Sequence, residues 1–473
     1  MKITLLFPVL LTLCFHWAFA PQTATAQHRG VFYGSPGIND ACYKLIRTAD
    51  EHYVTAGRVN NKAALYKFDC AGNIVDSFRL AMPNSPFHEF FDVLELPNGE
   101  FVAIGHVDIA GPKEGLAVRF TADLQALDFK TFLDLDRDIS LRQIVRNNAG
   151  QVFVGGLVQG VDIDYSNVFC ATFSVAPLVL QDSITEFTNG VDEVFSLTLC
   201  ADGNLLLTGV GRYGNIFFGE SLTDKYAFVR KIKPDGTLLW EYVRNAEIFK
   251  NKFGLSYFGD AIENENTGNI LAVGNKFTGD TLTNVLDAHF LLLSPNGQPL
   301  DALTIVMPGS QNLYQVIPSP NPDVPGFFAV GDSTPAVEPI KRAAPLLITV
   351  NEVNQKIELH SALTNQAGPL TIRSTVQVSE APPRVAFAGI YYNPAEPGEN
   401  HDLYIALPML EVEIAESGGT LTAAVLPVGN GYQYQWYTNG QPILGANGPA
   451  FTPTTSGEYT VVVIDPEYCT GEQ

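Results

Sequence analysis

Mainly apolar runs of five residues, each ending in glycine, recur along most of the chain and are separated by more polar stretches. There are seven such runs, and their glycines lie about 48 to 65 residues apart. A repeat period in this range is typical of stacked or circular repeat folds, including β-propellers. The runs are residues 53–57, 101–105, 152–156, 205–209, 270–274, 327–331 and 385–389.

Each run is one strand of a predicted unit of four. A turn such as Asn98-Gly99 precedes the run, and another short apolar segment lies before the turn. Because glycine supplies the positive φ that a two-residue hairpin turn needs, the two segments predict a hairpin. A variable polar loop, a third apolar run and a fourth segment follow, as in 226–232 and 237–243. Four antiparallel strands form a propeller blade, so the sequence predicts an all-β, seven-bladed β-propeller.

The seventh repeat lacks a fourth strand of its own. Its third strand ends near Leu407, and no strand pattern follows Pro408. The segment 31–33, directly before the first repeat, has the pattern of the missing strand. We therefore expect the N-terminal strand to complete the seventh blade, which closes the ring and removes exposed strand edges that invite aggregation.

The repeats resemble those of secreted bacterial β-propeller proteins, of the kind called delta-60 or SBBP-like. The copy at 194–242 carries the likeness best, with ADGN at 201–204, YAFV at 226–229 and KPDGTLLW at 233–240. The resemblance covers residues 30–409 and implies the propeller fold. It brings no catalytic residues with it, because propellers carry many unrelated functions.

A different pattern begins at about residue 410. Trp436 lies in an alternating strand, where an immunoglobulin-like sandwich buries its core tryptophan, and Tyr459 lies two residues before Val461, like the corner tyrosine of that fold. Residues 410–473 therefore resemble the cysteine-less Ig-like modules of bacterial surface proteins. Little chain remains for a final strand, which indicates a truncated module. Related architectures often end in a sorting domain for type IX secretion, and this export route is implied by the resemblance alone.

The first 26 residues have the pattern of a secretory signal peptide. Lys2 is followed by an apolar stretch over 5–19 and by the small residues at 24–26. We expect cleavage after Ala26, a propeller over 27–409 and a protein that is secreted or held at the cell surface. No later apolar stretch is long enough for a membrane span.

Acidic residues outnumber basic ones by 50 to 28, which gives a formal net charge of -22. Nucleic-acid binding is not expected, because a phosphate backbone is held by clusters of Lys and Arg. Five cysteines remain after signal removal, an odd number without the CxxC spacing of a zinc site. We expect no cofactor and a monomeric protein.

Alternating carboxylates offer one candidate metal site. Asp134, Asp136 and Asp138 could supply oxygen ligands to Ca²⁺ from a flexible loop. Ile139 and Val145 stand where an EF-type loop needs glycine and a bidentate glutamate. The alternative is a set of solvated acidic residues at a strand junction.

Three further acids, Asp92, Asp192 and Asp260, lie at the starts of first strands, where they would ring the mouth of the central channel. They could bind a cation or a sugar there. The alternative is that they cap the turns between blades through side-chain to backbone hydrogen bonds. No nucleophile-elbow motif is present, although a Ser-His-Asp set assembled in space stays open.

Long loops indicate which face of the propeller functions. Loops between second and third strands and those between blades emerge on one face, and there they are long, as in 210–225 and 391–402. Exposed aromatic rings on such loops suit sugar stacking or a protein interface, unless they fold inward and anchor their own loops. The candidate ligand-binding residues are Tyr213, Phe217, Phe218, Tyr257, Tyr391 and Tyr392.

Two hypotheses of function remain. The first is a non-enzymatic binding or adhesion protein that holds an extracellular carbohydrate or protein ligand on the long-loop face. The second is a secreted polysaccharide hydrolase or lyase with its site on the same face. An enzyme needs converging ionisable groups, so a pocket with two carboxylates or a histidine would favour the second hypothesis.

Overall fold

The computed structural model describes residues 28–33, 40–70, 72–82, 85–108, 113–132, 137–160, 166–181, 185–187, 193–213, 224–245, 257–277, 286–319, 326–334, 344–364, 370–380, 383–392, 401–408, 411–426, 432–439 and 441–464. Within these ranges the protein is all-β, built of antiparallel strands, and has no helix. The described part therefore holds no helix long and apolar enough to cross a membrane.

Most described strands belong to seven sheets of four or five strands, and six of these sheets are formed by segments that are consecutive in the sequence. The first three of these sheets are β2 (Ala41–Arg47), β3 (Tyr53–Val59), β4 (Lys62–Phe68) and β5 (Ile74–Arg79); β6 (Phe87–Glu95), β7 (Phe101–Asp108), β8 (Lys113–Phe120) and β9 (Ala126–Phe132); and β10 (Arg137–Arg146), β11 (Val152–Gly160), β12 (Ser166–Val175), β13 (Leu178–Leu180) and β14 (Thr185–Phe187).

The next four sheets repeat this plan. They are β15 (Glu193–Leu199), β16 (Leu205–Tyr213), β17 (Asp224–Ile232) and β18 (Leu238–Asn245); β19 (Tyr257–Glu263), β20 (Ile270–Phe277), β21 (Leu286–Leu293) and β22 (Pro299–Ile305); β23 (Ser310–Pro318), β24 (Phe327–Thr334), β25 (Ala344–Val353) and β26 (Lys356–Thr364); and β27 (Leu370–Glu380), β28 (Pro383–Tyr392), β29 (His401–Pro408) and β1 (His28–Tyr33).

The last of these sheets contains the N-terminal strand. β1 pairs antiparallel with β29, with Val31 opposite Ile405 and His28 opposite Pro408. The sequence-based prediction that the N-terminal strand completes the sheet of the seventh repeat is confirmed. Segments from the two ends of the repeat region thus share one sheet.

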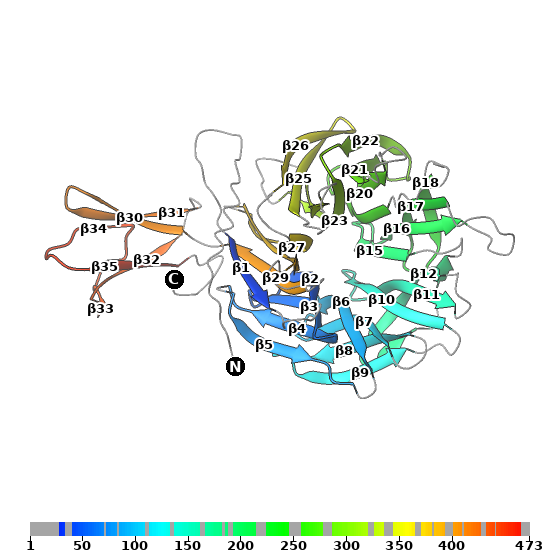
Figure 1. The fold of residues 1–473 in the computed structure, drawn as a ribbon, viewed down its shortest axis with the longest axis horizontal. Coiled ribbons are helices and arrows are strands. Elements are labelled where there is room, and N and C mark those ends of the chain that lie inside the picture. Colours follow the sequence, from blue (N-terminus) through cyan, green and yellow to red (C-terminus); the bar gives the residue numbers. More distant parts are fainter. Residues whose placement is uncertain are drawn as a thin grey trace.

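The sheets are arranged around a common centre (Figure 1). Strands β2, β6, β10, β15, β23 and β27 lie on the inside, whereas β5, β9, β18, β22 and β26 lie on the outside. A buried apolar cluster lies between each sheet and the next, and one further cluster joins the first sheet to the sheet of β27–β29. Burial of apolar area between neighbours therefore holds the whole ring together.

The repeat glycines allow the innermost strands to bulge. Gly105 pairs with Phe90, and the register then skips Phe91 and resumes at Asp92. A Cβ on Gly105 would lie 1.8 Å from the carbonyl oxygen of Glu89, so only glycine fits. The other six repeat glycines each pair with the residue before a bulge and would meet a backbone oxygen at 2.3 Å or less. The glycine found by sequence pattern is therefore the partner of a bulge.

The tight turns differ from the predicted two-residue loops. Gly99 has a φ of 80°, donates its N–H to Leu96 O (2.9 Å), and lies just before Glu100, whose carbonyl accepts from Leu96 N (2.7 Å). Glycine thus occupies the third position of a three-residue loop, a type I turn followed by a left-handed residue. The prediction of a hairpin with a positive-φ glycine is right, and its loop length is wrong by one residue.

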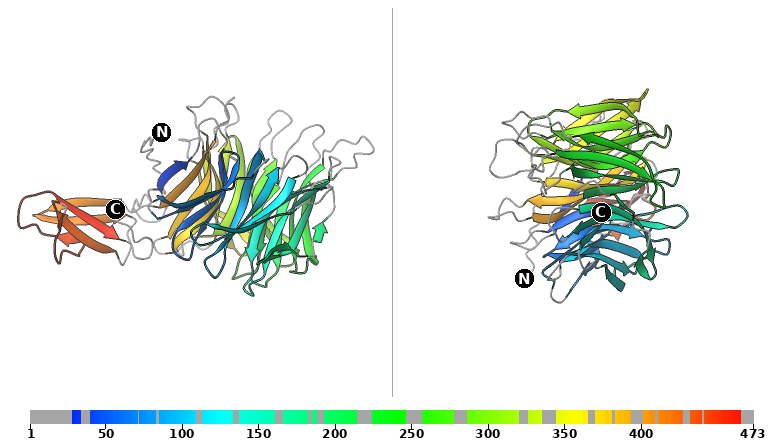
Figure 2. Two further views of the ribbon diagram at one scale, coloured as in Figure 1. Left: turned by 90° about the horizontal axis from the view of Figure 1, so that it is seen from below. Right: turned by 90° about the vertical axis from the view of Figure 1, so that its right-hand side faces the viewer.

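Two three-stranded sheets follow the ring and lie outside it (Figure 2). One contains β30 (Glu411–Ser417), β31 (Thr420–Leu426) and β34 (Ala450–Phe451), and the other β32 (Gln433–Thr438), β33 (Gln441–Pro442) and β35 (Tyr459–Ile464). Trp436 in β32 is fully buried, and its ring stacks on Phe451 at 5.8 Å. One tryptophan thus joins the two sheets.

Candidate functional site

Each innermost strand carries a bulge. The bulge marks two consecutive positions, the bulged residue itself and the residue that follows it. The bulged residues are Tyr43, Phe91, Arg142, Phe195, Gly259, Tyr314 and Arg373. The post-bulge residues are Lys44, Asp92, Gln143, Ser196, Asp260, Gln315 and Ser374.

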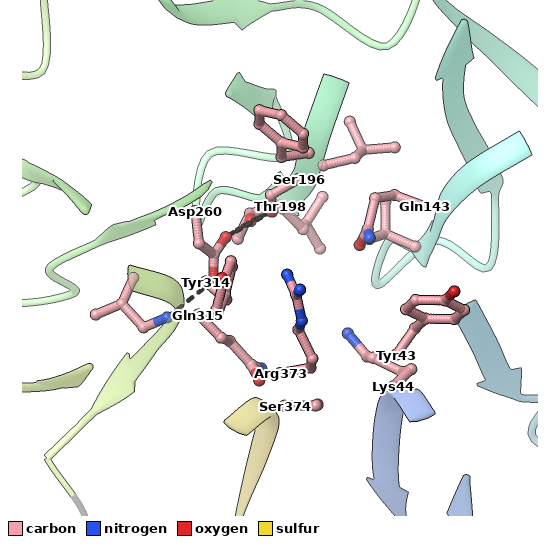
Figure 3. A pocket seen from close by; sticks show the side chains of 15 residues that line it. Tyr43, Lys44, Gln143, Ser196, Thr198, Asp260, Tyr314, Gln315, Arg373 and Ser374 are labelled. Carbon is pink, nitrogen blue, oxygen red and sulfur yellow. Dashed lines mark hydrogen bonds between the residues drawn. The ribbon is translucent and has the colours of Figure 1, made fainter. Parts of the chain in front are cut away.

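A cavity of about 230 Å³ lies among these positions (Figure 3). Its lining comes from the innermost strands of six different sheets, namely β2, β10, β15, β19, β23 and β27. Lys44 and Arg373 point into it, and Asp260, Gln143 and Gln315 also line it. We call this space the central cavity. It combines side chains that lie up to several hundred residues apart in the sequence.

Asp260 is the carboxylate of the central cavity, and both its oxygens are engaged. Oδ1 accepts hydrogen bonds from Ser196 Oγ at 2.5 Å and from Ala261 N at 2.9 Å. Oδ2 accepts from Val316 N, in the next sheet, at 3.0 Å. Burial raises the pKa of this carboxyl, and these donors together with the charge of Lys44 act against the rise. Asp260 therefore joins three neighbouring sheets.

Asp92 plays the same part on another side of the ring. Its carboxylate accepts hydrogen bonds from Val93 N at 2.8 Å and from Ile144 N, in the next sheet, at 3.0 Å. Lys44 Nζ lies 3.7 Å from Asp92 Oδ1. Burial raises the pKa of the Asp92 carboxyl, and the Lys44 ammonium acts in the opposite direction. The Asp92 carboxylate thus interacts with groups from both neighbouring sheets.

Two uncharged post-bulge residues make the same kind of tie. Gln315 Oε1 accepts a hydrogen bond from Thr375 N at 2.7 Å, and Ser374 Oγ accepts one from Leu45 N at 3.1 Å. Each bond joins the innermost strand of one sheet to that of the next. Asp92 and Asp260 therefore form side-chain to backbone hydrogen bonds, as in the capping alternative, but their partners lie in neighbouring strands and not in turns. Asp192 lies outside the described residues.

Tyrosines and cations lie one position earlier in the strands. Tyr43 donates its hydroxyl to Glu89 Oε2 at 2.8 Å, and Tyr314 donates to Asp332 Oδ2 at 2.7 Å. The guanidinium of Arg373 lies 3.9 Å from the centre of the Tyr314 ring. Burial and the facing carboxylate raise the pKa of both tyrosines. Their hydroxyls are therefore protonated, and they are poor bases.

A buried histidine cluster resembles a Ser-His-Asp set but lacks its geometry. His106 Nδ1 lies 3.2 Å from Ser140 Oγ, and His106 Nε2 lies 3.7 Å from both Asp108 Oδ1 and Glu89 Oε1. Ser140 and His106 are each 2% exposed and do not line the central cavity. Burial lowers the pKa of His106 to about 3, so the ring is neutral at physiological pH. The serine and the histidine are therefore buried away from the central cavity.

One group of metal-ligating side chains gathers within the described residues, and a lysine fills its centre. Cys200, Asp202 and Glu263 bring ligand atoms within 4.8 Å of one another. Lys231 Nζ lies 2.8 Å from Asp202 Oδ2 and 3.3 Å from Glu263 Oε1. Burial acts to lower the pKa of Lys231, but the hydrogen bond to Asp202 and the nearby negative groups raise it overall. The ammonium supplies the positive charge that a metal ion would bring.

The candidate aromatic residues fall into two groups. Phe217 and Phe218 lie outside the described residues, and of Tyr213 and Tyr392 only the strand positions are described, at the ends of β16 and β28. Tyr257 begins β19, and its ring lies 5.0 Å from that of Phe195. Tyr391 packs on the apolar cluster between the sheets of β23–β26 and β27–β29. Tyr257 and Tyr391 thus pack inward, as in the alternative in which the aromatic rings anchor their own loops.

The candidate calcium ligands are described only in part. Asp138 lies in β10, where its Oδ1 accepts a hydrogen bond from Lys113 N at 2.6 Å. Asp134 and Asp136 lie outside the described residues. Asp138 thus ties the start of β8 to the next sheet, as the post-bulge acids tie the innermost strands.

Sequence reasoning missed Lys44, Arg373, Gln143, Gln315 and Ser374. A signal for most of them exists, because every post-bulge residue lies 13 to 16 residues before its repeat glycine. A polar residue at that distance, inside an otherwise apolar strand, marks the channel position. The bulged residues have no such signal, since they range from glycine to arginine.

No protein-family model matches the chain, and no curated protein matches it. Solved structures do match. A PL25 polysaccharide lyase, an ulvan lyase bound to -[GlcA(1-4)Rha3S]-, is 10% identical, with 79% of this chain and 95% of that chain covered and a TM-score of 0.52. The Dos1 propeller is 10% identical (77% of each chain, TM-score 0.44), and Drosophila Plexin A in complex with Semaphorin 1b is 8% identical (80% and 88%, TM-score 0.43). At such identities the likeness concerns the fold alone, and this chain is an all-β protein with a propeller-like fold.

Proposed function

We propose that this chain is a secreted or cell-surface binding protein, built as a seven-bladed β-propeller over residues 27–409 and an Ig-like module over 410–473. The propeller holds an extracellular ligand on its long-loop face, where the central channel opens. The observation that carries the proposal is the central cavity, whose lining is polar while its one carboxylate, Asp260, is fully engaged in ties between sheets. Such a lining suits recognition.

The blade count and ring closure are supported by the pairing of sheets and apolar clusters. Seven sheets of four or more strands are present in the described part, and β1 closes the last of them. Closure pairs β29 with β1 and leaves short edges at the outermost strands, which suits a protein that must stay folded outside the cell.

The Ig-like assignment is supported by two aromatic residues. Trp436 is fully buried between the two sheets, and its Nε1 donates to Gly448 O at 3.0 Å. Tyr459 donates its hydroxyl to Thr455 O, four residues upstream, at 2.7 Å, as a corner tyrosine does. Val461 opposite Trp436 takes the place of the second cysteine.

Binding is favoured over catalysis because the central cavity lacks a proton-transfer pair. Among its lining residues there is one carboxylate and no histidine. A glycosidase needs two carboxyl groups across the scissile bond, and Asp260 has no partner of that kind among the residues lining the cavity. The alternative, a polysaccharide lyase, is favoured by one observation: Lys44 and Arg373 lie beside tyrosines and could hold a uronate carboxylate. The raised pKa of Tyr43 and Tyr314 opposes their use as the base.

The experiment that tests the proposal is a glycan and protein-ligand array probed with residues 27–473. We expect retention of at least one extracellular ligand and no release of unsaturated uronate from acidic polysaccharides. Turnover of a polysaccharide would establish the lyase alternative instead.

The long-loop face is tested by the double variant Phe217→Ser, Phe218→Ser. We expect an affinity for the array ligand at least about tenfold weaker, as for loss of an aromatic contact at an interface. The melting temperature should change little, since the two residues are predicted to lie in a loop and not in a sheet. The matched control is Phe129→Ser, because Phe129 lies on the outer strand β9 and is 59% exposed. Equal affinity of the two variants would place the ligand elsewhere.

A disulfide bears on how the two parts are joined. Cys70 is disulfide-bonded, and its partner lies outside the described residues. Once a leader ending at Ala26 is removed, Cys469 is the remaining candidate partner, because the other cysteines are free thiols. These are Cys42, Cys170 and Cys200.

We therefore expect non-reducing peptide mapping of the exported protein to recover a Cys70–Cys469 peptide pair. Reduction should then release the C-terminal module from the propeller and make the segment before residue 411 more sensitive to protease. A free Cys469 thiol in the native protein would contradict this pairing and would leave the C-terminal module joined to the propeller by the chain alone.

A further inference from the structure

We infer that the central cavity is a binding site for a single compact oxyanion, the carboxylate or sulfate group of an acidic extracellular ligand. The inference rests on the proposed binding function and specifies its ligand chemistry. Several side chains of the lining are already hydrogen-bonded to neighbouring sheets, and the groups that remain decide which ligand fits.

The carboxylate of the central cavity is largely engaged. Asp260 receives hydrogen bonds from Ser196, Ala261 and Val316, and a longer one of 3.4 Å from Thr198 Oγ1. Three of these donors meet Oδ1 and one meets Oδ2, so little acceptor capacity remains on this carboxylate. Lys44 and Arg373, which point into the same space, would repel a cation there.

Two other lining side chains keep donors for a ligand. Gln315 uses its carbonyl oxygen to accept from Thr375 N, which leaves its amide N–H groups, and Ser374 uses its oxygen to accept from Leu45 N, which leaves its hydroxyl proton. The same ties that join the sheets therefore convert these two side chains into net donors toward the cavity. A ligand that only accepts hydrogen bonds matches them.

The charges agree with the hydrogen bonds. Lys44 and Arg373 come from the innermost strands of adjacent sheets, β2 and β27, and both point into the cavity (Figure 3). Lys44 lies 3.7 Å from Asp92, a carboxylate that two backbone N–H groups already serve. An oxyanion between the ammonium and the guanidinium would be attracted by both. The guanidinium fork also matches the two oxygens of a carboxylate or sulfate.

Size and surroundings set the class of ligand. The cavity of about 230 Å³ is several times the roughly 30 Å³ that one water occupies in the liquid, so it admits an acidic group with part of its carrier. The whole chain carries a net charge of -22, so its outer surface repels anions in general. The positive lining is thus a local exception that selects an anionic group presented in the correct orientation.

The test is calorimetric titration of residues 27–473 with sodium glucuronate, sodium sulfate and glucose at low ionic strength. We expect glucuronate or sulfate to bind and glucose not to bind. Tighter binding of glucuronate assigns a uronate ligand, and tighter binding of sulfate assigns a sulfated one. Added sodium chloride should weaken either interaction.

Variants locate the site. Arg373→Gln and Lys44→Gln should each weaken anion binding by about tenfold or more, since each removes a charged hydrogen-bond donor. Lys44→Arg keeps the charge beside Asp92 and should retain binding even if Lys44→Gln fails to fold. The matched control is Lys356→Gln, an exposed lysine on the outer strand β26.

The inference is overturned if glucose binds as well as the anions, or if Arg373→Gln and Lys356→Gln have the same affinity. It can fail while the proposed function stands, which is the case if the array yields a neutral ligand. If the cavity binds the anions but the array retains no ligand, the inference stands and the proposed extracellular binding function is wrong.

Discussion

A chain that begins at Asp40, and so lacks β1, is expected to lose on the order of 5 kcal/mol of stability, because the six-residue pairing with β29 disappears and each lost hydrogen bond counts for about 1 kcal/mol. The loss also exposes the edge of β29, whose Leu403, Ile405 and Leu407 pack against the first sheet. We expect a strongly lowered melting temperature by calorimetry and self-association by size-exclusion chromatography.

The control for this deletion is a chain that begins at His28, which keeps the whole of β1. It should melt at the same temperature as the protein from residue 27. If the chain from Asp40 also melts there, β1 is dispensable and the ring is closed by the apolar cluster between the first and last sheets alone.

The second large effect is expected from Gly156→Ala. A Cβ at Gly156 would lie 2.3 Å from the carbonyl oxygen of Ser140 and 2.8 Å from the ring of Phe169. The bulge after Leu141 must then flatten or the strands must separate, and we expect a loss of about 3 kcal/mol, at the upper end of overpacking effects. Denaturant unfolding monitored by far-UV circular dichroism measures this loss.

The adjacent glycine gives a matched control. Gly155 lies next to Gly156 on β11, and a Cβ there would meet the Leu197 side chain at 3.4 Å, an ordinary contact distance. Gly155→Ala should therefore change stability by well under about 1 kcal/mol. Similar losses for the two variants would mean that strand propensity, and not the close approach to Ser140, explains why glycine ends each run.

The repeat architecture could be predicted because its signals are local. The apolar run with its glycine, the turn before it and the spare segment at 31–33 are each readable within a few residues, and β1 pairs with β29 as expected. The loop length was missed because Asn98-Gly99 suits both a two-residue turn and the three-residue loop, where the glycine follows the turn.

The central cavity could not be predicted in the same way. Its lining brings Lys44 and Arg373 to one space, and this depends on the closure of the ring and on bulges that no local pattern announces. The sequence places Asp92 and Asp260 at the starts of first strands, but their hydrogen bonds from Ile144 N and Val316 N depend on the neighbouring sheet. Loop aromatics such as Phe217 were chosen from loop length, a signal that says nothing about the channel.

At each bulge two adjacent residues are under different selective constraints: one ties the strand to the next sheet, and the other is free to vary with the ligand. A post-bulge residue such as Asp260 or Gln315 must serve the next sheet, so exchanging it disturbs the architecture. The bulged residues share no hydrogen bond of this kind, and their side chains vary: the seven positions hold tyrosine, phenylalanine, arginine and glycine. Gly259 is the exception, because a Cβ there would lie 2.3 Å from the carbonyl oxygen of Leu313. Four of the others, Tyr43, Phe195, Tyr314 and Arg373, line the central cavity. At these four positions ligand preference can change in evolution, or be rewritten by an engineer, while the surrounding sheets stay the same.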